Sequence, residues 1–144
     1  MRTVLVASAM LLALGACSKS GVHREGDTVT VTSEDGTKAT IGAAAPSHLP
    51  DYVKVYPGAK VTASVDNGVA GTLAMEVTDP PDKVLDFYRH QAEAAKLSST
   101  TEINQTGQGG GHMMVFTDPG GKRTLSVTAQ VTDGKTQVGV TYGG

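Results

Sequence analysis

The chain has few of the residues that usually stabilise or functionalise a small exported protein. Its 144 residues include one cysteine, no tryptophan, two phenylalanines and four tyrosines. One cysteine excludes an intramolecular disulfide, so stability has to come from a packed core built mainly of Val, Ala, Leu and Met. The 12 basic and 14 acidic residues form no cluster of one sign. This balance argues against nucleic acid as a partner.

The first 16 residues have the parts of a secretory signal. Arg2 gives a short basic start, residues 4–14 are uncharged and mostly apolar, and small residues precede Cys17. The apolar run is shorter than the roughly 20 residues that a membrane-spanning helix needs. An ordinary secretory signal followed by a stray cysteine is the alternative interpretation of this segment.

The end of this segment carries a further signal. The sequence Leu14-Gly15-Ala16-Cys17 resembles the lipobox of bacterial lipoproteins. That resemblance implies removal of residues 1–16 and attachment of diacylglycerol to the sulfur of Cys17, which is the predicted lipid-attachment residue. Two or three acyl chains, such as palmitate, anchor a protein stably, whereas one holds it weakly. Because Ser18 rather than Asp follows the cysteine, the resemblance also implies the outer membrane, with the chain facing the periplasm.

We expect four segments: a signal peptide over 1–16, a flexible tether over 17–27, a β-hairpin with its linker over 28–49, and a globular domain over 50–144. The tether is polar, contains glycine and shows no periodicity. In the hairpin, a three-residue loop, Glu34-Asp35-Gly36, sets Val29 opposite Ile41 and Val31 opposite Ala39. Since an isolated hairpin is marginal in water, we expect this apolar face to dock on the main domain.

Residues 50–144 predict an α+β domain with the order strand-strand-helix-strand-strand-strand-strand. The sheet is expected to be antiparallel, with about six strands and one helix packed on one face. A type II turn is expected at 56–59, and the strand over 60–66 is expected to place Val61, Ala63 and Val65 on one face. The helix is expected to begin with Asp79 as N-cap and Pro80 in its first turn.

One helix is too narrow for this sheet. Six strands span roughly 24 Å, whereas a helix covers about 10 Å. The docked hairpin, curling of the sheet, a protein partner, or an apolar groove for a lipid-like ligand would each account for the uncovered apolar surface.

The globular domain also resembles small bacterial envelope lipoproteins of uncharacterised function. The residues that carry the resemblance are LPDYVKVYPGAKV, from Leu49 to Val61, and a helix containing Phe87-Tyr88. The resemblance covers residues 49–144, concerns mainly structural motifs, and implies a non-enzymatic envelope component.

Residues with chemical potential are scattered along the chain. GQGGGHMM, residues 107–114, lacks the Lys-Ser/Thr and the following helix of a phosphate loop. His112, Met113 and Met114 are soft copper(I) ligands, but alternation separates Met113 from the other two. Gln91 lies within the apolar stripe of the helix. We therefore predict no catalytic residues, no metal and no cofactor.

The function predicted first is a lipid-anchored, non-enzymatic interaction or structural module with an envelope protein as its partner. The alternative is a protein that binds a lipid or another small apolar ligand in a groove on the sheet.

Overall fold

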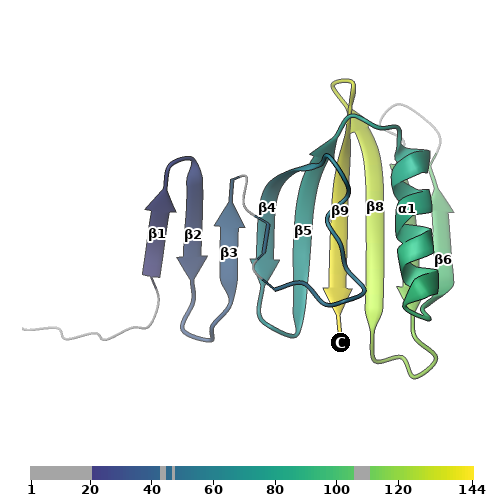
Figure 1. Ribbon diagram of the computed structural model, residues 1–144, viewed down its shortest axis with the longest axis horizontal. Coiled ribbons are helices and arrows are strands. Elements are labelled where there is room, and N and C mark those ends of the chain that lie inside the picture. Colours follow the sequence, from purple (N-terminus) through teal and green to yellow (C-terminus); the bar gives the residue numbers. More distant parts are fainter. Residues whose placement is uncertain (1–20, 43–44, 47, 106–110) are drawn as a thin grey trace, which may run out of the picture.

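The computed structural model describes residues 21–42, 45–46, 48–105 and 111–144. In this part of the chain one helix packs on one face of a single antiparallel sheet (Figure 1), which confirms the predicted α+β class. The strands lie in the order β1-β2-β3-β4-β5-β9-β8-β7-β6. Their bounds are β1 Gly21–Glu25, β2 Thr28–Thr32, β3 Lys38–Ile41, β4 Lys60–Asp66, β5 Ala70–Val77, β6 Ser98–Asn104, β7 Gly111–Thr117, β8 Thr124–Thr132 and β9 Lys135–Gly143; α1 spans Pro81–Ala94.

The sheet has nine strands in the described residues, where about six were expected. The six strands predicted for the globular domain are β4 to β9, and they follow the predicted order around α1. The other three belong to the N-terminal region. They extend the same sheet because β3 pairs with β4.

The predicted hairpin, β2 and β3, has the predicted register. Val29 lies opposite Ile41 and Val31 opposite Ala39. The Ser33 and Thr37 backbone groups bond at 2.9 Å, which leaves three loop residues, and Gly36 has a φ of +87°. The expected docking of the apolar face is wrong, however. The hairpin joins the edge of the sheet, so no other described element packs on its apolar face, and Ile41 is 64% exposed.

The tether expected over 17–27 contains strand β1. It pairs with β2 through a two-residue turn at Gly26 and Asp27, in which Gly26 has a φ of +58°. All five β1 residues are exposed. A strand without a buried side has no apolar alternation, so its residues resemble a polar linker.

The strand expected to place Val61, Ala63 and Val65 on one face is interrupted by a β-bulge. Val61 pairs with Met75, and the next pair is Ala63 with Ala74, so Thr62 is an extra residue. Val61 is buried in the core on the α1 side. The bulge turns Ala63 and Val65 to the other side of the sheet, since an extra residue reverses the alternation that follows.

The helix begins one residue later than predicted. Pro81 is its first residue and Pro80 is the N-cap, which makes no side-chain capping bond. Asp79 instead accepts a hydrogen bond from the Tyr56 hydroxyl at 2.8 Å. The predicted apolar stripe is largely confirmed. Its buried members are Val84, Leu85, Tyr88 and Ala92, and Phe87 and Ala95 are partly buried against the core.

The irregular segment before β4 adds to the core on the side of the sheet where α1 packs. The helix packs on β8 and β7, whereas Tyr52, Val53 and Tyr56 complete the core beside it. The turn at 56–59 has the predicted type II features, with an Ala59 to Tyr56 bond of 3.0 Å and a Gly58 φ of +75°. This segment crosses the sheet on the same side as the helix (Figure 1).

Candidate functional site

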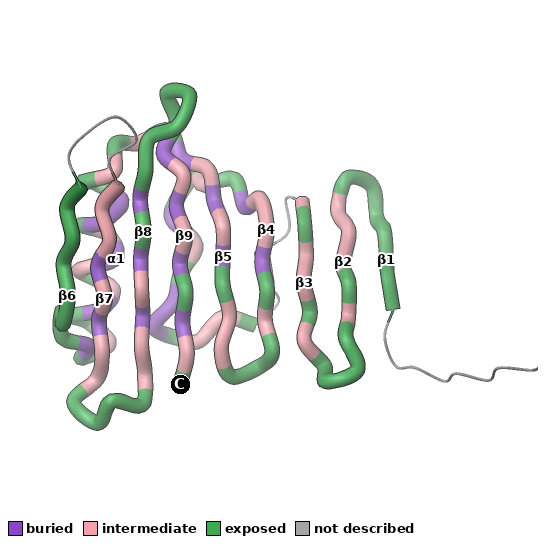
Figure 2. The backbone as a smooth tube through the Cα atoms, turned by 180° about the vertical axis from the view of Figure 1, so that it is seen from behind, coloured by how far each residue is buried: buried purple, intermediate pink, exposed green. Residues whose placement is uncertain are grey.

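The face of the sheet opposite α1, called the open face below, carries no helix in the described part of the chain (Figure 2). Residues that pair directly across neighbouring strands lie on the same face, so the pairing registers show which residues belong to the open face. One row runs across the sheet from β2 to β6 through Val29, Ile41, Ala63, Ala74, Gly139, Thr128, Met113 and Ile103. The side chains in this row are small in the middle of the sheet and larger toward both edges.

A hollow of about 440 Å³ lies on the open face, over β5, β9, β8, β7 and β6; it is called the sheet hollow. Its described lining residues are Ala74, Met75, Ile103, Gln105, Gly111, His112, Met113, Thr128, Ala129, Gln130, Gln137, Val138 and Gly139. None of these residues is an acid, a lysine or an arginine. The volume lies within the range of about 300–1,000 Å³ that small-molecule sites have.

The floor of the sheet hollow is low because two neighbouring strands place small residues side by side. Ala74 of β5 lies opposite Gly139 of β9, and Gly139 lies opposite Thr128 of β8. A Cβ at residue 139 would come within 2.7 Å of the Thr128 hydroxyl oxygen. That hydroxyl donates to the Gly139 carbonyl at 3.3 Å, so the floor is closed by a short side chain that already has a partner.

The rim of the sheet hollow is apolar on the β6 and β7 side. Ile103 lies opposite Met113, and Ile103 is 42% exposed. The glutamines Gln105, Gln130 and Gln137 add amide groups that both donate and accept hydrogen bonds. Gln137 already reaches the Glu76 carboxylate at 3.4 Å. The site therefore combines an apolar bed with uncharged polar groups.

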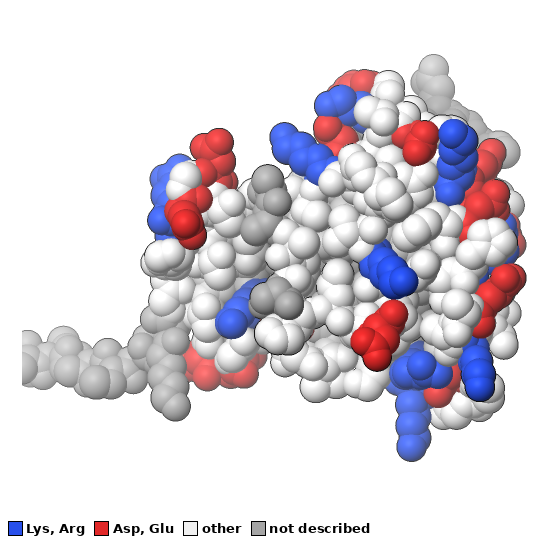
Figure 3. Space-filling model, in the orientation of Figure 1, with Lys and Arg blue, Asp and Glu red and all other residues white. Residues whose placement is uncertain are grey.

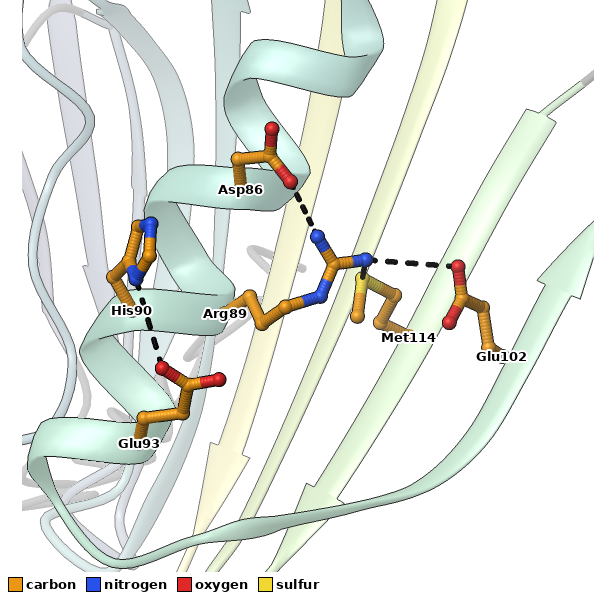
Figure 4. Close-up of polar contacts among 6 residues, drawn as sticks. All are labelled: Asp86, Arg89, His90, Glu93, Glu102 and Met114. Atoms are coloured by element: carbon orange, nitrogen blue, oxygen red, sulfur yellow. Dashed lines mark hydrogen bonds and ion pairs between the residues drawn. The ribbon is translucent and has the colours of Figure 1, made fainter.

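Arg89 connects α1 to edge strand β6 and so supports that rim (Figure 4). Its guanidinium donates to Asp86 on the helix and forms a 3.6 Å ion pair with Glu102 on β6. It also lies 3.6 Å from the sulfur of Met114. Because Glu102 points toward the helix, its neighbour Ile103 faces the sheet hollow.

The space between α1 and the sheet is filled by side chains. Tyr88 of the helix is fully buried and donates from its hydroxyl to the Lys54 carbonyl at 2.9 Å. Leu73 and Val140, on facing strands beneath, have no exposed surface. Side chains of the described residues thus fill the space around Tyr88, and we take the sheet hollow on the open face as the candidate site.

The residues considered as metal or phosphate ligands do not form such a site in the described part of the chain. Met114 is buried in the core, Met113 lies on the open face, and His112 Nδ1 lies 2.8 Å from Asn104 Oδ1. No group of three or more His, Cys, Asp or Glu residues there is arranged to hold a metal ion. Residues 107–110 lie outside the described residues.

Gln91 and Cys17, the other residues singled out from the sequence, are not among the described residues that line the sheet hollow. Gln91 is half-buried beside the segment around Tyr52, in a different pocket from the sheet hollow. Cys17 lies outside the described residues. Among the described residues, no helix has the length and apolar character required to cross a bilayer.

Charged side chains gather mainly over α1 and at the ends of strands in the view from the helix side (Figure 3). The pairing registers place four on the open face: Arg24, Lys60, Glu76 and Lys135. Lys135 donates to Glu76, and this bond is the main reason that the pKa of the Glu76 carboxyl is lowered. Cations outnumber anions on this face.

A model of the START domain-like family matches residues 59–138, which extend from just before β4 into β9. The match covers more than half of the 144 residues, so the chain belongs to the START domain-like family. No curated protein matches the chain significantly. The matched part includes the helix and most of the sheet hollow, and leaves out β1, β2 and β3.

The sequence did not identify the sheet hollow by residue. Along the chain, Ala74, Thr128 and Gly139 are only small residues within three separate strands. Their meeting depends on strand order, since β9 lies between β5 and β8. The detectable signal was indirect: more apolar sheet surface than one helix can cover.

Proposed function

We propose that this chain is a lipid-anchored envelope protein that binds a small, uncharged apolar ligand in the sheet hollow. The anchor is the acylated Cys17, and the protein faces the periplasm from the outer membrane. The role is binding rather than catalysis. START-like domains are generally binding domains, which supports this choice.

The observation that carries the proposal is the sheet hollow itself. Its floor of Ala74 and Gly139 leaves space for a ligand, and Ile103 and Met113 offer apolar contacts at its side. A charged headgroup would find no described acid, lysine or arginine in the lining. An aliphatic chain ending in a hydroxyl or amide fits this chemistry, because the glutamines can bond to that polar end.

The proposal is tested with the full-length lipidated protein anchored in phospholipid vesicles. A long-chain alcohol that carries a diazirine is added and activated by light. The adduct is then located by peptide mass spectrometry, and we expect it on peptides that contain Ile103 or Met113. Light-dependent labelling separates a bound ligand from the acyl groups already on Cys17.

Two variants make this experiment specific. Ala74→Leu fills the floor of the sheet hollow and should reduce labelling at least fivefold. Thr72→Leu adds the same side chain on the same strand and face, two residues away and outside the lining, and should leave labelling unchanged. Equal labelling of both variants and the wild-type chain would overturn the proposal.

A second candidate is the interaction or structural module predicted first. The observation that favours it is the free edge of β1, whose five residues are all exposed and whose outer backbone groups face no strand among the described residues. Such an edge can accept a strand from another protein. A reproducible cross-link from β1 to one envelope protein in intact cells would support this role.

A further inference from the structure

We propose that the open face lies on the lipid bilayer that holds Cys17, so that the sheet hollow opens toward the leaflet. This inference rests on the proposed lipid attachment at Cys17, and it adds an orientation and a source for the ligand. The occupant of the face is the bilayer surface, and the contacts are made by the N-terminal strands β1, β2 and β3.

The first argument is the distance to the anchor. Residues 17 to 21 are linked by four Cα–Cα steps, which span at most about 14 Å in a fully extended chain. Gly21 begins β1. If Cys17 sits at the membrane surface, β1 is held within that distance of it. The N-terminal strands are therefore the part of the fold nearest to the lipid.

The second argument is the contrast between the two sides of these strands. On the open face lie exposed aliphatic residues: Val22 is 74% exposed, Ile41 64% and Val31 40%. The α1 side of the same strands is polar, and the paired residues Thr30 and Thr40 bond to each other through their hydroxyls at 3.3 Å. One side suits a lipid surface and the other suits water.

The third argument is continuity with the candidate site. Val22, Val31, Ala39 and Val65 form a second row of paired residues across β1 to β4. The bulge at Thr62 places Val65 on the open face, which is also the face of the sheet hollow. A bilayer in contact with this row would lie beside the hollow. An apolar ligand could then move from the leaflet to the protein without crossing water.

Charge agrees with this orientation. The open face carries Arg24, Lys60 and Lys135 against Glu76 among its described residues. Basic side chains beside apolar ones are favourable at a surface with anionic lipids.

The experiment uses the full-length protein with one added cysteine at a time. Acylation consumes the natural thiol of Cys17, so the added thiol alone takes an environment-sensitive nitrobenzoxadiazole label. Ile41→Cys and Thr40→Cys are neighbours on opposite faces of β3, and Val31→Cys and Thr30→Cys form a second pair on β2. The labelled proteins are anchored in vesicles of phosphatidylethanolamine and phosphatidylglycerol, with or without lipids that carry a quenching nitroxide on the acyl chain.

We expect a blue-shifted emission and at least threefold stronger nitroxide quenching at residues 41 and 31 than at residues 40 and 30. Equal quenching within each pair would overturn the orientation. So would a blue shift at residue 41 without nitroxide quenching, because a protein surface would then cover the face. Flotation with the vesicles is measured in parallel. Loss of flotation reports failure of the anchor, whereas retained flotation with equal quenching reports failure of the orientation alone.

Discussion

Val65 of β4 lies directly opposite Ala39 of β3, on the face of the sheet that α1 leaves uncovered. This pair joins the hairpin to the START domain-like part of the chain side by side rather than face to face. Consequently, β1, β2 and β3 share the ladder of the sheet but contribute no residue to the buried core.

This attachment predicts uneven local stability. Backbone amides of β2 should exchange with deuterium at least 100-fold faster than those of β5 and β9, which flank each other in the centre of the sheet. The reason is that Val29 and Val31 can separate from the edge without opening the core. Hydrogen exchange with mass spectrometry on the detergent-solubilised full-length protein measures this. Equal protection of β2 and β9 would show that the hairpin is an integral part of the cooperative unit.

Two buried tyrosine hydroxyls differ in their partners, which gives a matched pair of variants. The Tyr88 hydroxyl donates to the Lys54 carbonyl, whereas the buried Tyr142 hydroxyl has no hydrogen-bond partner among the described residues. Burial raises the pKa of both phenols, so both stay neutral at ordinary pH. Tyr88→Phe should lower the free energy of unfolding by about 1–2 kcal/mol, since a bond is lost and a carbonyl left unpaired.

Tyr142→Phe serves as the contrast. Removing a buried hydroxyl that has no hydrogen bond should leave stability unchanged or raise it by up to about 1 kcal/mol. Urea unfolding of both variants provides the measurement. A loss for Tyr142→Phe as large as that for Tyr88→Phe would mean that this hydroxyl has a partner, such as an ordered water.

Gly71 is required by close packing against the same tyrosine. A Cβ there would meet the Tyr142 hydroxyl and, at 2.6 Å, the carbonyl oxygen of Val65. Gly71→Ala should therefore destabilise the fold by about 1–3 kcal/mol. Gly111→Ala is the control, because its nearest neighbour would lie at 3.8 Å. Similar thermal midpoints for the two variants would contradict this packing argument.

The parts of the fold that could be predicted from the sequence are those fixed by local patterns. The hairpin register follows from aliphatic alternation together with the loop around Gly36, because one loop length alone aligns Val29 with Ile41. The helix stripe follows from a 3.6-residue period, and Tyr88 lies within it. In both cases neighbouring residues carry the whole signal.

Other parts depend on partners that are distant in sequence. The bulge at Thr62 is defined by the pairing with β5, and the alternation of β4 gives no sign of it. The core residues Tyr52 and Tyr56 come from an irregular segment without periodicity. The sheet hollow needs Ala74 and Gly139 to be neighbours, which only the strand order produces. Long-range pairing therefore decided the features closest to function.

Acid should weaken the fold in part through two carboxylates near the ends of elements. The Tyr56 hydroxyl is the main cause of the lowered pKa of Asp79, and the Arg123 backbone N–H is the main cause of the lowered pKa of Asp118. A pKa lower in the folded state contributes stability above the unfolded value, near 4, and loses it as pH falls through the folded value. The urea concentration at the midpoint of unfolding should thus decrease as the pH falls below about 4.

The Tyr56→Phe variant tests the origin of that acid dependence. Without the hydroxyl, the pKa of Asp79 should move back toward its ordinary value, so the drop in the urea midpoint between pH 5 and pH 3 should become smaller than in the wild-type chain. An unchanged drop would exclude the Tyr56 bond as a source of the acid sensitivity.

The membrane anchor predicts a result that no property of the folded domain would produce. Cys17→Ala removes the residue that accepts the acyl chains. Because stable anchoring needs at least two chains, the variant should lose its stable attachment to the membrane. Cells are labelled with a radioactive fatty acid and fractionated. The wild-type chain should carry label and sediment with outer membranes, whereas the variant should carry none. Ser18→Ala, one residue away, should still be labelled. If the variant still sediments with membranes and the wild-type chain carries no label, the lipoprotein assignment is disproved. The membrane-facing orientation of the open face then fails with it.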